Sequence, residues 1–351
     1  LYRTPAVKWH HNAIFISHSK ILTGDHFVMG KISLAITLAH ASITLLCLAP
    51  VKVATAQQFP TKPIRWIVGP SSELPPRVVA QRLSQMWGQQ VLVDARPGGG
   101  GTIAAETVLR ALPDGYTWLY SSAVYTMSAS LIANPTFDLV RDFAPVTLLI
   151  SAPFYLTVHP SLAVQNVKEL TALAKERPSL LNYASSGIGT PLHLAAELYK
   201  SMAGINIVHV PYKTVAAAMT EQIAGQVQIS LQYGPLSLPQ VRAGKLRGLA
   251  STSLKRSPFA PEFPTMDESG LPGYEMIGWN GLHVPKNVPA SIINKLSTDV
   301  RQALQAQEVQ ERLSSASLDI HGNSRTEFDN FVNRDRARWI KVVKDAGITP
   351  E

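Results

Sequence analysis

The sequence predicts an α/β protein with two similar lobes, each a mostly parallel sheet flanked by helices, joined by two hinge strands. Two observations carry this prediction: short apolar runs alternate with helical patterns twice along the chain, and two long apolar segments separate these repeats. The composition, 46% hydrophobic and 16% charged over 351 residues, is that of a globular protein with buried cores.

The first α/β unit follows residue 60. Its predicted strands and helices alternate in the order 64–68 (strand), 76–87 (helix), 91–94 (strand), 102–112 (helix) and 117–121 (strand). The strands are continuously apolar, as expected where helices cover both faces of a sheet. In such open sheets, ligands bind at the carboxyl ends of the strands.

The second α/β unit begins near residue 160. Its predicted order is 167–177 (helix), 181–184 (strand), 192–203 (helix) and 207–210 (strand). The apolar segments 145–159 and 274–285 are interpreted as the two hinge strands. We therefore expect residues 57–156 and 280–351 to form lobe 1, and residues 157–279 to form lobe 2.

The C-terminal part is predicted to be helical over 289–304 and 308–314, followed by a last helix. Ser324 opens that helix, and Glu327 lies three residues further on, which is the spacing of a capping box.

The N-terminal segment 29–56 has the pattern of a signal peptide. A basic start at Lys31 precedes an uncharged stretch, and the sequence Ala54-Thr55-Ala56 has the small residues of a cleavage site. We expect cleavage after Ala56 and a periplasmic location; a retained membrane anchor is the alternative. Residues 1–28 are interpreted as a non-native upstream extension.

Charge and cysteine content exclude several function classes. The net charge of +8 is spread without a lysine or arginine run, so no nucleic-acid partner is predicted. Cys47 is the single cysteine and lies in the predicted signal peptide, so no disulfide, thiol or thiolate metal site is expected. Leu46 before it argues against lipidation. We predict no cofactor.

Catalytic motifs are absent from the sequence. No Gly-x-Ser-x-Gly is present, and His193 with Glu197 lacks the second histidine of a helical metalloprotease site. No catalytic or metal-binding residue is predicted, although an enzyme that uses His193 and Glu197 as acid and base remains an alternative.

Two loops could hold an anion. The glycine-rich turn 96–102 and the hydroxyl-rich loop 182–190 each lie between a predicted strand and a predicted helix, where backbone N–H groups and the helix dipole favour a negative group. Each is also compatible with a purely structural turn.

Short motifs follow one another over nearly the whole chain after residue 56. They are Pro63-Ile64-Arg65, Arg96-Pro97-Gly98, Pro113-Asp114-Gly115, Asp142-Phe143-Ala144-Pro145, the loop 182–190 with His193 and Glu197, Val208-His209-Val210-Pro211-Tyr212-Lys213, Gly225-Gln226-Val227, Ala243-Gly244-Lys245 and Gly270-Leu271-Pro272-Gly273. In this order the motifs resemble the Bug family, the solute receptors of tripartite tricarboxylate transporters. The resemblance implies a type II periplasmic-binding-protein fold.

The resemblance also implies a site and a function. The expected ligand-binding residues are Ser71, Ser72, Ser121, Ser122, Ser185, Ser186, Gly187, Gly189, Thr190, His193 and Gln232. The implied protein is a monomeric periplasmic receptor that hands a small carboxylate to membrane permease subunits. Two alternatives remain: a sensor of the same fold, and a receptor that has lost ligand binding.

Several positions depart from the family pattern, all of them near the expected cleft. The loop 68–76 is shorter and lacks the usual paired glycines and aspartate, Ala95 replaces asparagine, Thr214 replaces glycine, and Gln232 replaces an aspartate. Because two carboxylates are missing, a plain carboxylate or an aromatic acid is expected rather than an amino acid.

Overall fold

The computed structural model describes residues 59–128, 131, 135–345 and 347–348. The predicted upstream extension (1–28) and the predicted signal peptide (29–56), including Cys47, lie outside the described residues. The part described belongs to one compact unit that extends from Gln58 to the C-terminus.

The first sheet is built around three parallel strands. β1 (Ile64–Val68) lies between β2 (Val91–Ala95) and β3 (Thr117–Ser122). The antiparallel strand β9 (Ile277–Pro285) continues the sheet from β3 to β4 (Phe143–Val158), and the short β10 (Asp319–Ile320) pairs with β4. All residues of β1 are apolar and buried except Arg65, which is exposed.

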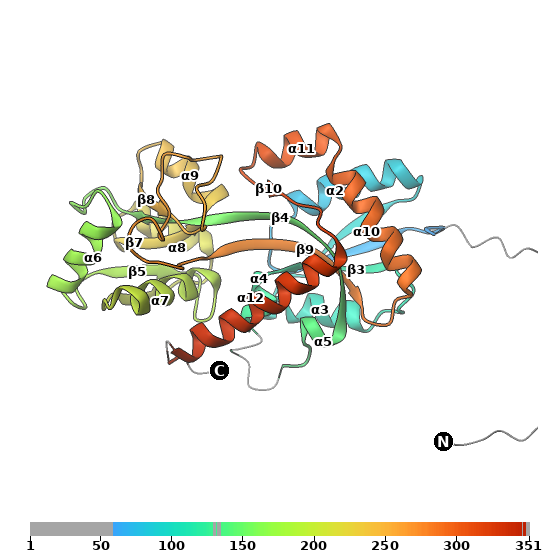
Figure 1. Ribbon diagram of the computed structural model, residues 1–351, viewed down its shortest axis with the longest axis horizontal. Coiled ribbons are helices and arrows are strands. Elements are labelled where there is room, and N and C mark those ends of the chain that lie inside the picture. Colours follow the sequence, from blue (N-terminus) through green and yellow to red (C-terminus); the bar gives the residue numbers. More distant parts are fainter. Residues whose placement is uncertain (1–58, 129–130, 132–134, 346, 349–351) are drawn as a thin grey trace, which may run out of the picture. The chain divides into compact units, whose positions relative to one another are not determined.

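Helices cover both faces of this sheet. One core cluster packs α2 (Leu74–Trp87), α10 (Ala290–Leu304) and α11 (Gln307–Ser314) against it. The other cluster includes α3 (Thr102–Leu109), which follows the 3-10 turn 99–101, together with α4 (Ala123–Ser128) and α12 (Arg325–Asp345). Figure 1 shows these elements around the first sheet.

The second sheet repeats the arrangement. β5 (Asn182–Ser185) lies in parallel between β6 (Val208–Pro211) and β7 (Ile229–Tyr233), and β7 pairs antiparallel with the distal part of β4. β8 (Arg247–Ser251) also pairs with β4. The helices of this part are α6 (Val167–Glu176), α7 (Pro191–Ala203), α8 (Val215–Ile223) and α9 (Gly234–Arg242).

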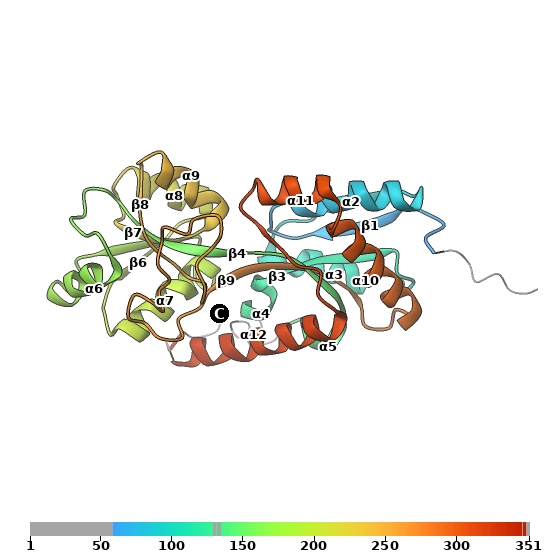
Figure 2. The ribbon, with the colours of Figure 1, turned by 45° about the horizontal axis from the view of Figure 1, so that its top comes forward.

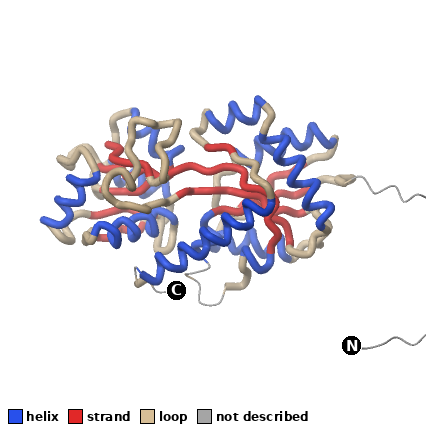
Figure 3. Tube along the Cα trace, viewed as in Figure 1, coloured by secondary structure: helices blue, strands red, loops and turns tan. Residues whose placement is uncertain are grey.

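Two long strands connect the sheets. Every residue of β4 is buried; its first part, up to Pro153, pairs with β9, and its last part, from Phe154, pairs with β7. Figures 1 and 3 show β4 and β9 running side by side between the two groups of helices. The strand order β2-β1-β3-β9-β4-β7-β5-β6 is therefore nearly symmetric about the β9–β4 pair, and the predicted two-lobed α/β architecture is confirmed. The exact lobe boundaries stay a prediction.

The C-terminal helix α12 packs along elements of both sheets. Its buried side chains share one core cluster with residues of β3 and of α7, and Figure 2 shows the helix extending beneath the hinge strands. Ser324 and Glu327 form the predicted capping box: the Ser324 N–H donates to Glu327 Oε2 (2.8 Å), and the Glu327 N–H donates to Ser324 Oγ (3.3 Å).

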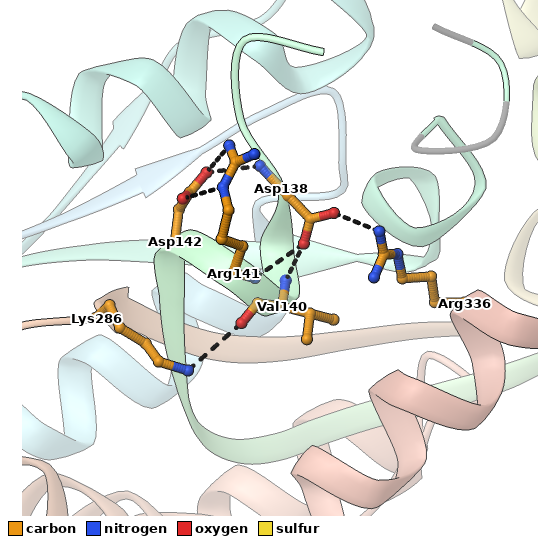
Figure 4. Close-up of polar contacts among 6 residues, drawn as sticks. All are labelled: Asp138, Val140, Arg141, Asp142, Lys286 and Arg336. Carbon is orange, nitrogen blue, oxygen red and sulfur yellow. Dashed lines mark hydrogen bonds and ion pairs between the residues drawn. The ribbon is translucent and has the colours of Figure 1, made fainter. Parts of the chain in front are cut away.

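A polar cluster fixes α12 to the start of β4 (Figure 4). Asp138 caps the short helix α5 (Leu139–Asp142) by accepting from the N–H groups of Val140 and Arg141. Its other carboxylate oxygen accepts from Arg336 of α12 at 2.6 Å. Asp138 thus caps the N-terminus of α5 and also binds Arg336 of α12.

The structure differs from the sequence prediction in two ways: it contains elements that the prediction did not name (α4, α5, α8, α9, β7, β8 and β10), and several predicted elements have other ends. α2 begins at Leu74, because proline is tolerated in the first turn of a helix. α3 ends at Leu109 instead of 112, since Pro113 disfavours helical geometry in the residue before it. β9 begins at Ile277, because the chain makes a turn at Gly273 with Tyr274 N–H bonded to Leu271 O.

Candidate ligand-binding cleft

A cleft of about 1100 Å³ lies at the carboxyl ends of the strands of both sheets. The loops that follow β1, β2 and β3 line it on one side, and the loops that follow β5, β6 and β7 line it on the other. Residues of β4 and β9 complete it. This is the position at which open α/β sheets bind ligands, and the volume slightly exceeds the usual range for small-molecule sites, roughly 300–1,000 Å³.

Part of the predicted site lines this cleft. The predicted residues found there are Ser71, Ser72, Ser122, Ser186, Gly189 and Thr190. The hydroxyl group of Ser122 is buried and has no hydrogen-bond partner among the described residues. A buried hydroxyl without a partner is costly, so this group is available to a ligand or to water.

Ser121 does not line the cleft. Its buried hydroxyl donates to the carbonyl of Gly281 at 3.0 Å and lies 2.7 Å from Nδ1 of His283, so it connects β3 to β9. Burial lowers the pKa of His283 to about 3, which keeps the imidazole neutral in this contact.

Ser185 and Gly187 stabilise the loop after β5 through hydrogen bonds inside the loop. The Ser185 hydroxyl accepts from the Gly187 N–H (3.0 Å) and lies 2.6 Å from Nε2 of His209. Thr190 Oγ1 donates to the Gly187 carbonyl at 2.7 Å. Gly187 has φ of 121°, a backbone conformation that favours glycine. Neither Ser185 nor Gly187 lines the cleft.

His193 lies beneath the same loop, in a buried aromatic and charged network. Its ring is 4.4 Å from that of His209, and His209 stacks on Tyr183 at 4.9 Å. Glu197 accepts from the Tyr183 hydroxyl (2.6 Å) and from Lys200 (2.7 Å). Burial lowers the pKa of His193, and lowers that of His209 to about 4, so both rings are neutral at pH 7.

Gln232 is fully buried and does not line the cleft, and neither its amide nitrogen nor its amide oxygen has a hydrogen-bond partner in the described residues. Its neighbour Tyr233 does line the cleft. The other departures from the family pattern face the cleft directly: residues 69–75, Ala95 and Thr214 are all among its lining.

Helix α7 begins at the cleft. Its N-cap residue Thr190 makes no side-chain cap, and its hydroxyl donates to the carbonyl of Gly187. Thr190, Pro191 and Leu192 line the cavity. The positive end of a helix of 13 residues therefore starts at the cleft without an acceptor from its own cap residue.

Sequence reasoning did not select several lining residues. They are Phe154, Lys213, Tyr233, Trp279 and Asn280. Lys213 lies in a motif that the sequence analysis identified, two residues after the end of β6, and this position could have indicated it. Trp279 and Asn280 belong to β9, and no local pattern relates that strand to loops more than a hundred residues earlier in the chain.

Trp279 is held from behind by α12. Its Nε1 donates to Asp335 Oδ2 at 2.9 Å, and the same carboxylate accepts from Thr126 (2.6 Å) and from the Trp339 indole (3.1 Å). Asp335 therefore ties α12 to α4 and to the strand at the floor of the cleft.

The acid–base alternative finds no support in this geometry. His193 Nε2 lies 3.9 Å from Glu197 Oε1, its Nδ1 accepts from a backbone N–H, and neither side chain lines the cleft. Within the described ranges, no group of three or more His, Cys, Asp or Glu side chains could hold a metal ion.

Comparison with known proteins decides the family. The model of the tripartite tricarboxylate transporter family receptor matches residues 76–348. The chain belongs to this receptor family. Protein BugT of Bordetella pertussis is 31% identical over 299 residues, which cover 84% of this chain and 92% of BugT. The receptor's partner is therefore a membrane transporter of the tripartite type.

Solved structures of the receptor family agree with the fold. The R. palustris protein Rpa4515 with adipate has a TM-score of 0.76 and 34% identity, covering 84% of this chain and 100% of that one. The periplasmic binding protein BugD has a TM-score of 0.73 and 29% identity, covering 84% and 100%. The predicted type II periplasmic-binding-protein fold is confirmed. In the part of the receptor that the structure describes, no helix is long and apolar enough to cross a membrane.

Proposed function

We propose that this receptor captures a small carboxylate in its cleft, in the periplasm, and delivers it to the permease subunits of a tripartite tricarboxylate transporter without chemical change. The observation that carries the proposal is the buried, unpartnered hydroxyl of Ser122 in a cleft where α7 also begins uncapped. A hydroxyl donor and a helix N-terminus both suit an anion.

The proposal divides the predicted residues by role. Ser71, Ser72, Ser122, Ser186, Gly189 and Thr190 face the ligand, whereas Ser121, Ser185, Gly187, His193 and Gln232 hold the strands and loops that position them. The adipate bound to Rpa4515, a relative of 34% identity, supports a carboxylate ligand here. We further propose that the protein acts as a monomer after removal of the signal peptide, with lobes of residues 57–156 plus 280–351 and 157–279.

Thermal denaturation in the presence of acetate, hexanoate, benzoate, adipate, citrate and glutamate tests this function. A ligand at a hundred times its Kd stabilises the folded state by about 2.7 kcal/mol. For domains of this size, that raises the Tm by roughly 5 °C. Proton NMR of the bound acid should show no turnover. If no carboxylate raises the Tm, the proposed function is wrong.

A further inference from the structure

The floor of the cleft is apolar. Ile150 and Phe154 of β4 and Trp279 of β9 line it, and each is less than 5% exposed. The one polar atom of the Trp279 ring donates to Asp335 and is therefore not available in the cleft. A ligand that lies on this floor meets hydrocarbon and aromatic surface, without hydrogen-bonding groups from these three side chains.

The rim of the cleft carries exposed apolar side chains from both sheets. Leu74, at the start of α2, is 38% exposed; Ile188 and Leu236, which follow β5 and β7, are 55% and 46% exposed. Single exposed apolar residues are common on protein surfaces, but these three surround one cavity. An apolar group that enters the cleft removes their surface from water as well as its own.

The charges of the cleft suit a single acidic group. Of the described residues that line it, Lys213 and Glu73 alone carry a charge. Glu73 accepts from Arg77 Nε at 2.9 Å, whereas Lys213 has no hydrogen-bond or ion-pair partner in the described part of the chain. One carboxylate can therefore pair with Lys213, but a second would find no further cation among the described residues that line the cleft.

We propose that the ligand is a monocarboxylate with an apolar body, either an aliphatic chain or an aromatic ring. This inference rests on the proposed function and adds the substrate class to it. The carboxylate lies near Ser122, Lys213 and the start of α7, and the body lies on the floor formed by Ile150, Phe154 and Trp279.

Calorimetric titration with acetate, butyrate, hexanoate, octanoate, benzoate, adipate and citrate tests the inference. Because each buried methylene group contributes about 0.8 kcal/mol, Kd should fall up to about fourfold for each methylene added between acetate and hexanoate. Hexanoate should bind more tightly than adipate, which has the same number of carbon atoms but a second carboxylate in place of the terminal methyl group. Citrate should bind most weakly.

The outcomes distinguish the inferred substrate class from the proposed function on which it rests. A Kd that does not change along the monocarboxylate series, or tighter binding of adipate or citrate than of hexanoate, would overturn the apolar, singly charged ligand and leave the carboxylate receptor intact. Binding of none of these acids would overturn both.

Two matched variants locate the contact. Ile188→Ser removes an apolar side chain at the rim of the cleft, and Leu254→Ser removes one of similar exposure, 50%, that does not line it. Ile188→Ser should weaken hexanoate binding about three- to tenfold more than acetate binding, whereas Leu254→Ser should leave both unchanged. Equal effects of the two variants on hexanoate would contradict the proposed position of the apolar body.

Discussion

The backbone N–H of Gly189 donates a hydrogen bond to Nδ1 of His193, 3.1 Å away in the first turn of α7. Gly189 lines the cleft and His193 lies beneath it, so the shape of the loop depends on a histidine that has an unprotonated Nδ1. Protonation would replace this acceptor with a donor, and two donors would then face each other.

Acid should therefore destabilise the protein. The unfolded chain takes up a proton on His209 near pH 6.5, but the folded chain does so only near pH 4, because burial and the adjacent His193 lower the pKa of His209. The unfolded state binds more protons between these values, so this contribution to stability is complete above pH 6.5 and is lost as the pH falls toward 4. Burial also lowers the pKa of His193. The charge of Glu197 opposes this shift, and the charge of Lys200 adds to it.

Melting curves from pH 4 to 8 on two variants check the role of His193. His193→Asn retains an acceptor near the position of Nδ1 without a titrating ring, so its stability and ligand affinity should depend less on pH than those of the wild type. His193→Leu removes the acceptor and should weaken ligand binding at every pH. Identical pH profiles of the wild type and His193→Asn would exclude His193 as a source of the acid sensitivity.

Ser122→Ala should separate binding from stability. The hydroxyl has no partner in the described residues, so its removal should leave the unliganded Tm unchanged or slightly higher. A lost hydrogen bond to a carboxylate corresponds to about 1.5–3 kcal/mol, which weakens binding roughly 10- to 150-fold. Ser121→Ala is the control, because its hydroxyl bonds to Gly281 and it should lower the Tm without a comparable effect on affinity. Calorimetry and melting curves on both variants measure the two quantities.

Gly189→Ala should distort the cleft loop. Gly189 has φ of 72°, and an added Cβ would lie 2.5 Å from Cδ1 of Leu131. Gly204→Ala is a matched control, since Gly204 has φ of 60° with no atom within 4 Å of an added Cβ. Both variants should lose about 1–2 kcal/mol of folding stability, because alanine is strained in the left-handed backbone conformation. Only Gly189→Ala should also lose ligand affinity. Equal affinities in the two variants would show that contact with Leu131 is unimportant for the site.

Asp335→Asn should destabilise the protein by about 2–3 kcal/mol, because an amide cannot accept all three hydrogen bonds that the buried carboxylate accepts. The Tm should fall by roughly 4–6 °C. Asp329→Asn, an exposed position on the same helix, should have no measurable effect. A melting temperature for Asp335→Asn within 1–2 °C of wild type would mean that the network is not cooperative.

The exported protein should begin at Gln57. We expect cleavage after Ala56 because small residues at positions 54 and 56 follow an uncharged segment. Intact-mass measurement of the periplasmic fraction checks the new N-terminus. Recovery of a chain that still contains residues 29–56 in the membrane fraction would favour the anchor instead.

The sequence predicts β1 to β6 and β9, because strands buried on both faces leave continuous apolar runs in the chain. It misses β7, which contains the buried polar residues Ser230 and Gln232, and the strands β8 and β10. It predicts the site less well. Ser121 and Ser122 are adjacent, as are Gln232 and Tyr233, yet only the second residue of each pair lines the cleft. Successive side chains of a strand point to opposite faces, and a shared motif does not say which face a position takes. Trp279 requires the tertiary pairing of β9 before its role can be recognised.

The position of β9 also sets the order in which the molecule can form. Ser121 and Gly281, which bond across β3 and β9, are 160 residues apart, and β9 lies between β3 and β4. During synthesis from the N-terminus, β3 keeps an unpaired edge until residues 277–285 have been made. Contacts of such long range make folding slow. The complete sheet can therefore form only after the C-terminal segment that contains β9 has been made.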